Sequence, residues 1–236
     1  MKIEIWSDII CPFCTIGKRH LELALEQFEH AEDADIIWRS FELDPNAPDE
    51  VEGNLAEGVA QKYGISLEQS IESQKDVARR AQAVGLTFNW ENARFGNTFN
   101  AHRLIHLAAQ HGLEDAAQEV FTTAYFSRGK SIGNDAVLTE LAQEIGLDEN
   151  QVQEVLHSDA YADVVRADET RAQQLGIHGV PFFLIEEKWA INGAQPPEII
   201  LGALRQVWAE LHPQQTPQFI AVDGTGNAPT CGPAGC

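Results

Sequence analysis

The alternation of apolar and polar residues predicts a strand, a helix and a second strand at the start of the chain. Residues 2–6 alternate in character and are followed by Ile9 and Ile10, which is typical of a short strand that ends in a turn. The β-branched and aromatic residues of segment 36–43 predict the second strand. Between them, apolar residues fall at the spacing of one helix face, at Ile16, Leu21, Ala24, Leu25 and Phe28.

The complementary half of this α/β unit comes only near the end of the chain. Residues 182–185 and 189–191 have the composition of two strands around a turn at 186–188. The 138 residues between Leu43 and Phe182 are far more than a crossover connection needs. A final helix is predicted from an apolar face formed by Ile200, Leu204, Val207, Trp208 and Leu211.

The long intervening stretch has the periodicity of helices. Ser66 with Gln69 and Asp148 with Gln151 have the spacing of capping boxes at helix starts. We therefore expect an α/β fold with a large all-helical insertion between the second and third strands. Residues 1–48 and 178–211 would form one domain, and residues 49–177 the insertion. Apolar residues share helix faces at Leu67, Ile71, Ala78 and Ala81, at Ala101, Leu104, Ile105 and Ala108, and at Leu138, Leu141 and Ile145.

Two cysteines, Cys11 and Cys14, stand at the predicted junction of the first strand and helix. A Cys-x-x-Cys at this point of a strand–helix–strand unit is typical of a thioredoxin-like redox motif. Disulfide exchange needs one thiolate that attacks and a second thiol that resolves the mixed disulfide. A helix start favours negative charge on Cys11, and we expect Cys14, one turn along, to be the more shielded residue. The motif predicts a thiol–disulfide oxidoreductase of thioredoxin fold.

Two other interpretations of this pair remain. The first is half of a zinc site, which would need two further ligands. The second is a pair of buried core cysteines without chemistry. The Pro12–Phe13 pair between the cysteines, at a strand-to-helix turn, favours redox chemistry over both.

Residues 212–236 differ in composition from the rest and form a predicted C-terminal tail without Lys or Arg. The tail ends in a second close pair, Cys231 and Cys236. The glycines and proline between them permit a tight loop, so a disulfide between them is sterically feasible. We interpret them as an accessory redox pair that exchanges with Cys11. A spare disulfide and metal-binding thiols are the alternatives.

Charge and composition exclude several classes of partner. Sixteen Lys and Arg face 36 Asp and Glu, a formal net charge of -20, which repels nucleic acid and anionic membranes. Neither a secretory signal nor an apolar run of about 18 residues is evident, so we expect a cytoplasmic protein. We expect no metal and no tightly bound cofactor. The expected substrates are proteins or small thiols that carry a thiol or disulfide, with glutathione or another thiol as redox partner.

Five groups of residues resemble the FrnE type of DsbA-like oxidoreductases, in the same order over roughly residues 1–211. This family is related to 2-hydroxychromene-2-carboxylate isomerase and kappa-class glutathione transferases, and the resemblance implies a thioredoxin fold with a helical insertion. An alternative function is therefore glutathione-dependent isomerisation or transfer on a small aromatic or polyketide substrate. Those enzymes typically have Ser where Cys11 stands. A third class, a peptide-binding chaperone, would not need the cysteines. The groups are residues 7–14 with 16–19, 41–45, 97–98 with 101–104, 179–183 and 192–197.

The resemblance also assigns roles to individual residues. It implies a cis peptide bond between Val180 and Pro181, in a loop that packs beside the redox pair and offers backbone groups to an extended substrate. Pro12 and Phe13, with Val180 and Pro181, would support the active site. Four further residues are candidate substrate contacts: Asn97 and His102 in the insertion, and Asp44 and Asn46 in the loop after the second strand.

Overall fold

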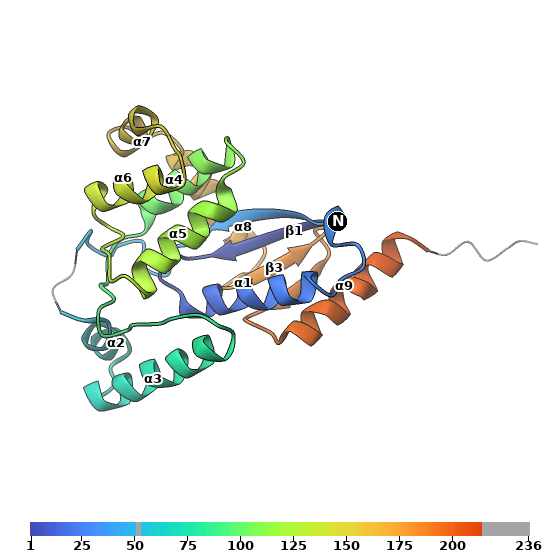
Figure 1. The fold of residues 1–236 in the computed structure, drawn as a ribbon, viewed down its shortest axis with the longest axis horizontal. Helices are drawn as coiled ribbons and strands as arrows, with labels where there is room; N and C mark the ends of the chain where they lie inside the picture. The colour runs from blue at the N-terminus through green and yellow to red at the C-terminus, as the bar shows by residue number, and fades with distance from the viewer. Residues whose placement is uncertain (51–52, 214–236) are drawn as a thin grey trace, which may run out of the picture.

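The computed structural model describes residues 1–50 and 53–213 (Figure 1). The strands are β1 (Lys2–Ser7), β2 (Asp35–Ser40), β3 (Phe182–Ile185) and β4 (Trp189–Asn192), with a 3-10 turn, Ala31–Asp33, before β2. The helices are α1 (Pro12–Leu25), α2 (Leu55–Tyr63), α3 (Leu67–Ala83), α4 (Phe99–Ala109), α5 (Glu114–Phe126), α6 (Asp135–Glu144), α7 (Glu149–Leu156), α8 (Ala162–Gln174) and α9 (Pro197–Leu211).

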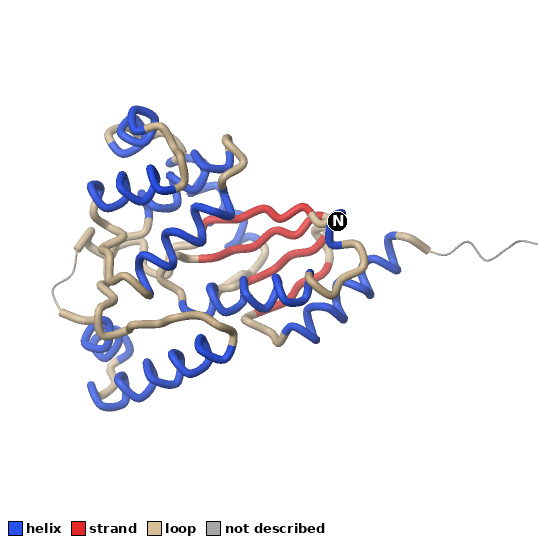
Figure 2. Tube along the Cα trace, viewed as in Figure 1, coloured by secondary structure: helices blue, strands red, loops and turns tan. Residues whose placement is uncertain are grey.

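The four strands form one sheet in the order β2–β1–β3–β4 (Figure 2). β1 and β2 run parallel, with Ile5 opposite Trp38. β3 lies antiparallel to β1, and β4 antiparallel to β3. The strand–helix–strand unit at the start of the chain is thus joined by the two strands predicted near its end, which confirms the expected α/β architecture.

Helices cover both faces of the sheet. Successive side chains of β1 point to opposite faces and pack in two different cores. Ile3 and Ile5 pack in one core with residues of α1 and α9. Trp6 points to the other face, where it packs with Ala172 of α8 and Leu184 of β3. As a result β1 is buried at every position from Ile3 to Ser7.

Helices α2 to α8 lie between β2 and β3, as the insertion predicts. In Figure 1, α2 and α3 lie on one side of the start of α1, and α4 to α7 on the other. Helices α2 to α7 share a core of their own, which also includes Ile9, Ile10 and Ile16 from the β1–α1 turn and the start of α1. α8 contacts β2 and covers the sheet, although it falls within residues 49–177. The domain boundaries themselves stay a prediction.

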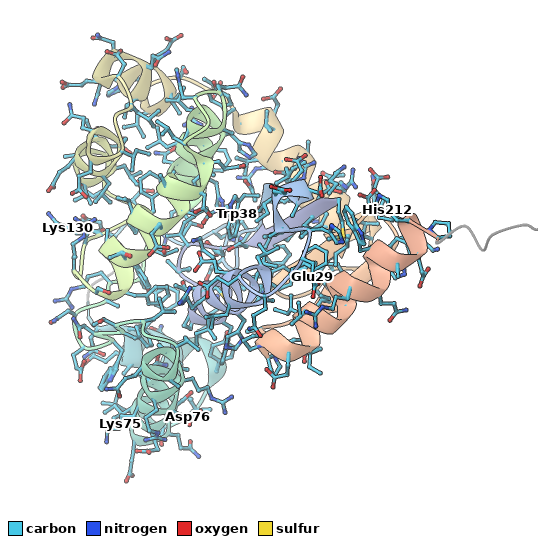
Figure 3. The ribbon with its side chains drawn as sticks, turned by 45° about the vertical axis from the view of Figure 1, so that its right-hand side comes forward. Glu29, Trp38, Lys75, Asp76, Lys130 and His212 are labelled. Carbon is cyan, nitrogen blue, oxygen red and sulfur yellow. The ribbon has the colours of Figure 1, made fainter. Side chains whose placement is uncertain are left out.

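The helix starts follow the local sequence signals. Ser66 and Gln69 form a reciprocal capping box at the start of α3, as predicted. The Asp148 side chain accepts the backbone N–H groups of Asn150 and Gln151 at the start of α7. These caps fix the residues at which α3 and α7 begin. The outer surface of the insertion carries charged side chains. Figure 3 shows Lys75, Asp76 and Lys130 on the outer surface of the insertion.

The second strand is shorter than the sequence predicts. The composition of residues 36–43 predicts a strand that reaches Leu43, but β2 ends at Ser40. The reason is a competing partner for the backbone: the N–H of Leu43 donates to Asp8 Oδ2 at 2.7 Å instead of continuing the ladder with β1. The chain therefore leaves the sheet and passes beside the β1–α1 turn.

Candidate active site

Cys11 is the N-cap residue of α1, with extended backbone angles of φ −89° and ψ 110°. Its Sγ accepts the backbone N–H of Cys14 at 3.3 Å, and its thiol donates to the carbonyl oxygen of Val180 at 3.6 Å. The residue is 4% exposed. Its sulfur nevertheless contacts two polar backbone groups, the N–H of Cys14 and the carbonyl oxygen of Val180. A donated N–H and the start of a helix both stabilise negative charge on this sulfur.

Cys14 lies one turn further along α1 and is 3% exposed. The exposed fractions of the two cysteines thus differ by only one percentage point, and Cys14 is the less exposed, in the direction that the sequence predicts. The loop at Val180 covers Cys11 as well, which keeps the difference small. Burial raises the pKa of the Cys14 thiol well above its ordinary value, and the hydrogen bond and charge of Cys11 raise it further. Cys14 therefore stays protonated at neutral pH.

The loop opposite the cysteines has the geometry that the resemblance implied, since the Val180–Pro181 peptide bond is cis. The close approach of α1 to this loop depends on Gly17. A Cβ at Gly17 would lie 2.8 Å from Pro181 Cγ and 3.4 Å from the Phe183 ring. Glycine at this position lets the helix that carries the cysteines rest directly on the loop.

The edge of the site is apolar. Pro12 is the first residue of α1, where the missing N–H of proline costs no hydrogen bond. Phe13 is 42% exposed and Leu43 is 39% exposed. Large exposed apolar side chains are a feature of surfaces that bind partners.

Asp8 is a buried acid that sequence reasoning did not single out. It is 0% exposed, and its backbone carbonyl accepts the N–H of Cys11 at 3.1 Å. Its Oδ1 lies 3.4 Å from Nε2 of His102, which is 1% exposed. Burial, with a further contribution from the Asp8 charge, raises the pKa of Tyr125. A single acidic residue has no periodic pattern or motif of its own, so its burial is visible only in three dimensions.

The predicted substrate contacts lie in different surroundings. His102 is buried against Asp8, which favours a structural role. The Asn97 side chain donates to the carbonyl of Ala47 at 3.0 Å and accepts the N–H of Phe99 at 2.8 Å, so it ties the loop after β2 to the start of α4. Asp44 pairs with Lys62 at 3.2 Å, and Asn46 is exposed. Contact of these four residues with a substrate stays a prediction.

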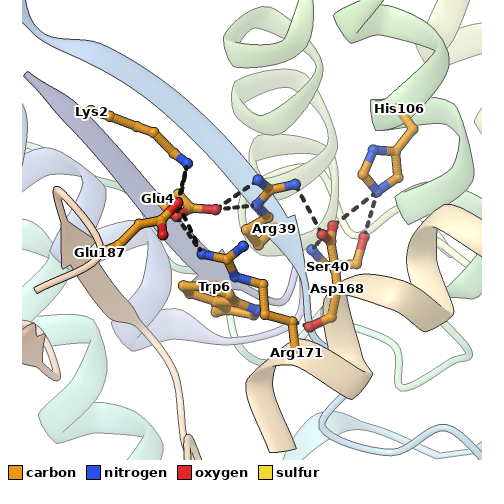
Figure 4. Close-up of polar contacts among 9 residues, drawn as sticks. All are labelled: Lys2, Glu4, Trp6, Arg39, Ser40, His106, Asp168, Arg171 and Glu187. Atoms are coloured by element: carbon orange, nitrogen blue, oxygen red, sulfur yellow. Dashed lines mark hydrogen bonds and ion pairs between the residues drawn. The ribbon is translucent and has the colours of Figure 1, made fainter. Parts of the chain in front are cut away.

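A second buried polar cluster holds the sheet to the insertion (Figure 4). Glu4 of β1 is 0% exposed and accepts hydrogen bonds from Arg39 at 2.9 and 2.6 Å and from Arg171 at 2.9 Å. Asp168 of α8 accepts from Arg39 at 3.1 Å and lies 3.3 Å from Nε2 of His106 on α4. Strand, α8 and α4 are thereby joined on the face opposite α1. Buried charges of this kind are tolerated only when they are paired.

Some predictions fall outside what the structure describes. Cys231 and Cys236 belong to residues 214–236, which lie outside the described residues. Within residues 1–50 and 53–213, no group of three or more His, Cys, Asp or Glu side chains could hold a metal ion. Across the same ranges, no helix is long and apolar enough to span a membrane.

The sequence matches the family model described as "DSBA-like thioredoxin domain" over residues 2–205. A probable DsbA oxidoreductase from Streptomyces coelicolor is 39% identical, with a TM-score of 0.85 over 100% of this chain and 98% of that one. A 2-hydroxychromene-2-carboxylate isomerase has a TM-score of 0.67 at 15% identity, over 89% and 98% of the two chains. The cytosolic disulfide reductase DsbM from Pseudomonas aeruginosa has a TM-score of 0.63 at 18% identity, over 89% and 100%, and is also solved with GSH. These last two likenesses concern the fold alone.

Proposed function

Because the chain belongs to the family of DSBA-like thioredoxin domains, we propose that it is a thiol–disulfide oxidoreductase whose redox pair is Cys11 and Cys14. The single observation that carries the proposal is the setting of Cys11. Its Sγ stands at the N-cap of α1, accepts the N–H of Cys14 and faces the Val180 carbonyl of the cis-proline loop. The other three site residues, Pro12, Phe13 and Pro181, shape the surface on which a substrate disulfide would lie.

The reduced enzyme acts in two exchange steps. The Cys11 thiolate attacks one sulfur of a substrate disulfide, which breaks the substrate S–S bond, forms a mixed disulfide with Cys11 and releases the other substrate sulfur as a thiolate. Cys14 then gives its proton to water, and its thiolate attacks Cys11 Sγ. The mixed disulfide breaks, the Cys11–Cys14 disulfide forms, and the second substrate thiolate leaves. The substrate gains two electrons and the enzyme loses two. The same steps in reverse oxidise a dithiol.

The fates of the two thiols follow from their surroundings. An N–H and a helix start stabilise negative charge on Cys11, so it is the attacking group. The raised pKa of Cys14 holds it as a thiol until the mixed disulfide has formed. A neutral resolving thiol leaves Cys11 without a competing negative charge beside it. This asymmetry makes Cys11 the entry point for substrate.

The proposed substrates are proteins or small molecules with a thiol or disulfide, and a thiol such as glutathione is the proposed redox partner. The GSH-bound structure of the DsbM fold relative supports a small thiol in this role. We propose no tightly bound cofactor and a cytoplasmic location. Cys231 and Cys236 are proposed as an accessory pair that exchanges with Cys11. Removing residues 212–236 should then slow exchange of the Cys11–Cys14 disulfide, and an unchanged rate would exclude that role.

The direct test is turnover of a peptide disulfide with reduced glutathione as electron donor. Wild-type protein should turn over, and the Cys11→Ser variant should lose activity to the level of the uncatalysed reaction. The Thr170→Ser variant, a small change on exposed α8 surface, serves as the control. Equal activity of wild type and Cys11→Ser would refute the proposal. Equilibration of Cys11–Cys14 with glutathione mixtures would then give the direction, since about 30 mV corresponds to a tenfold change in a two-electron equilibrium.

The alternative function, glutathione-dependent isomerisation, is supported by the fold of the 2-hydroxychromene-2-carboxylate isomerase. It predicts a different result from the same protein. The double variant Cys11→Ser, Cys14→Ser would keep glutathione-dependent conversion of a hydroxychromene carboxylate, while disulfide turnover would be lost. Absence of that conversion in both wild type and double variant excludes the alternative.

A further inference from the structure

A pocket opens beside the redox turn, on the side of α1 away from the cis-proline loop. It has a volume of about 200 Å³, and its walls are Pro12, Thr15 and Ile16 of α1, the segment after α3, and α5. Cavities of about 150 Å³ hold a benzene molecule, so this one has room for a long side chain. A second hollow of about 380 Å³ shares Thr15, Gly85, Leu86 and Glu119 with it. The two hollows adjoin, and we call them together the depression; Pro12, the residue after Cys11, lines the first of them.

The floor of this depression is apolar. Ile16, Phe88 and Phe126 line it and are 4%, 8% and 4% exposed. The methylene groups of a bound side chain would be removed from water there, which stabilises binding in proportion to the apolar area that is buried. The floor therefore favours a chain of several methylenes over a short polar side chain.

Three polar groups of the rim, on Ser127, Thr123 and Glu119, offer hydrogen-bond acceptors. The Ser127 hydroxyl already donates to the carbonyl of Thr87 at 2.8 Å, and the Thr123 hydroxyl donates to Glu119 at 3.5 Å. Their remaining capacity is to accept. The Glu119 carboxylate can only accept. The Thr15 hydroxyl lines both hollows without a hydrogen-bond partner and can donate or accept. Together these groups favour a bound group that is rich in donors, as an ammonium or guanidinium group is.

The charges around the depression have the matching sign. The Lys18 ammonium is shared by three carboxylates: it bonds Glu22 and lies 3.4 Å from Asp115 and 3.2 Å from Glu119. Arg19 lies 3.2 Å from Glu22 and 3.5 Å from Glu26. Glu22 and Glu119 line the depression beside Lys18 and Arg19. Asp115 and Glu26 contact the same two cations from outside the lining, so the cluster of four carboxylates and two cations has an excess of two negative charges. Such a site attracts a cation and repels glutathione, whose two carboxylates outnumber its single amine.

We propose that this depression binds a Lys or Arg side chain of a disulfide-containing polypeptide substrate, close to the substrate cysteine that joins Cys11. The methylenes lie on the apolar floor, and the cationic head bonds Glu119 and the rim hydroxyls. Because the pocket begins at Pro12, the basic residue stands two or three positions from that cysteine, at about 3.3 Å per residue of extended chain. The inference names the substrate class of the proposed oxidoreductase and rests on that function.

The test uses three synthetic peptide disulfides that differ only in one residue, Arg, Gln or Glu, two or three positions from the cysteine. For the full chain, kcat/KM should follow the order Arg, Gln, Glu. Glu119 is 51% exposed, so the step from Arg to Gln should be about fivefold, the upper end for an exposed ion pair. The preference should fall towards unity as salt is raised to about 1 M. Equal kcat/KM for the three peptides at low salt would overturn the proposal.

The Glu119→Gln variant separates recognition from structural damage. It should lower kcat/KM for the Arg peptide and raise it for the Glu peptide, with the Gln peptide near its wild-type value. Glu140→Gln is the matched control, because Glu140 is 54% exposed and pairs with Lys130 at 3.0 Å much as Glu119 pairs with Lys18. A uniform change across the three peptides in Glu119→Gln would overturn the proposal.

A second readout keeps this inference distinct from the proposed function. Hydroxyethyl disulfide carries no charge and does not reach the depression. If wild type turns over this small disulfide and Cys11→Ser does not, the oxidoreductase function stands whatever the peptides show. If neither protein turns over any disulfide, the proposed function fails first.

Discussion

Glu114 offers a test of how the insertion is docked on the sheet. It is the first residue of α5 and lies against β2, the edge strand of the sheet, where its carboxylate bonds the backbone of Trp38. Burial raises its pKa from 4.5 to about 7, against the lowering effects of that hydrogen bond and of Arg39. The folded protein therefore favours the neutral, protonated form of this carboxyl group over the charged form. Replacing it by the neutral isostere, in Glu114→Gln, keeps an oxygen that can accept the Trp38 N–H.

The magnitude follows from the pKa difference. The rise to about 7 corresponds to about 3 kcal/mol between the two protonation states, and solvent screening of this partly exposed group reduces it to about 1.5 kcal/mol. Because the pKa of Glu114 is higher in the folded than in the unfolded protein, the protonated carboxyl group stabilises the fold fully at pH values below 4.5. This stabilisation is lost as the pH rises through about 7. Glu114→Gln should therefore match wild type at pH of about 4.5 and be more stable by about 1.5 kcal/mol at pH of about 8.

The assay is urea unfolding of the reduced proteins at these two pH values and constant ionic strength. A thermal scan at the higher pH should show a Tm rise of about 3–6 °C for a chain of this size. Glu149→Gln is the matched control, because Glu149 is the first residue of α7 but is exposed. A stability difference in Glu114→Gln that does not change with pH, or that favours wild type at high pH, would refute the reasoning.

Three further predictions concern the active site and its support. Cys14→Ser should accumulate a mixed disulfide on Cys11, visible by mass spectrometry of the intact protein, and a free Cys11 after turnover would count against the order of attack. Burial raises the Cys14 pKa, so the fraction of attacking Cys14 thiolate grows with pH. In wild type, the rate at which Cys14 resolves the mixed disulfide should therefore rise close to tenfold per pH unit between about pH 6 and 8. Stopped-flow fluorescence measures this rate, and a rate that does not change with pH would contradict the prediction. Asp8→Asn should lose about 1–3 kcal/mol in urea unfolding, because an amide NH₂ would replace one of the two buried carboxylate oxygens and remain without an acceptor or displace the Leu43 N–H. A loss below about 0.5 kcal/mol, as in the exposed Asp35→Asn control, would show that the buried carboxylate contributes little.

The order and type of most helices and strands could be predicted, because the residue patterns along the chain agree with the tertiary packing. Helix-face spacing in the insertion, capping pairs such as Ser66 with Gln69, and the strands after Pro181 all depend on neighbours in sequence. The family resemblance added the cis bond at Val180–Pro181, which no periodicity could give. The Cys11–Cys14 pair was recognisable as a candidate redox pair because the two cysteines are only three positions apart.

The buried charges could not be predicted, since their partners come from distant segments. Glu4 alternates with Ile3 and Ile5 along β1, a pattern typical of a strand with one solvated face. In the structure its face is covered by α8, and Arg39 and Arg171 neutralise it. Asp8 is hidden for the same reason. It accepts from Leu43, 35 residues away, and faces His102 in the insertion.

The isoleucines at the β1–α1 turn have a consequence for engineering. Ile9, Ile10 and Ile16 flank the cysteines in sequence, yet they pack with the helices of the insertion and not with the sheet. A truncated protein with a short crossover in place of those helices would leave the three side chains in water and lose the support of the turn that carries Cys11. Transferring the proposed reactivity of Cys11 to another protein therefore requires the turn and the insertion helices that pack against it to be moved together.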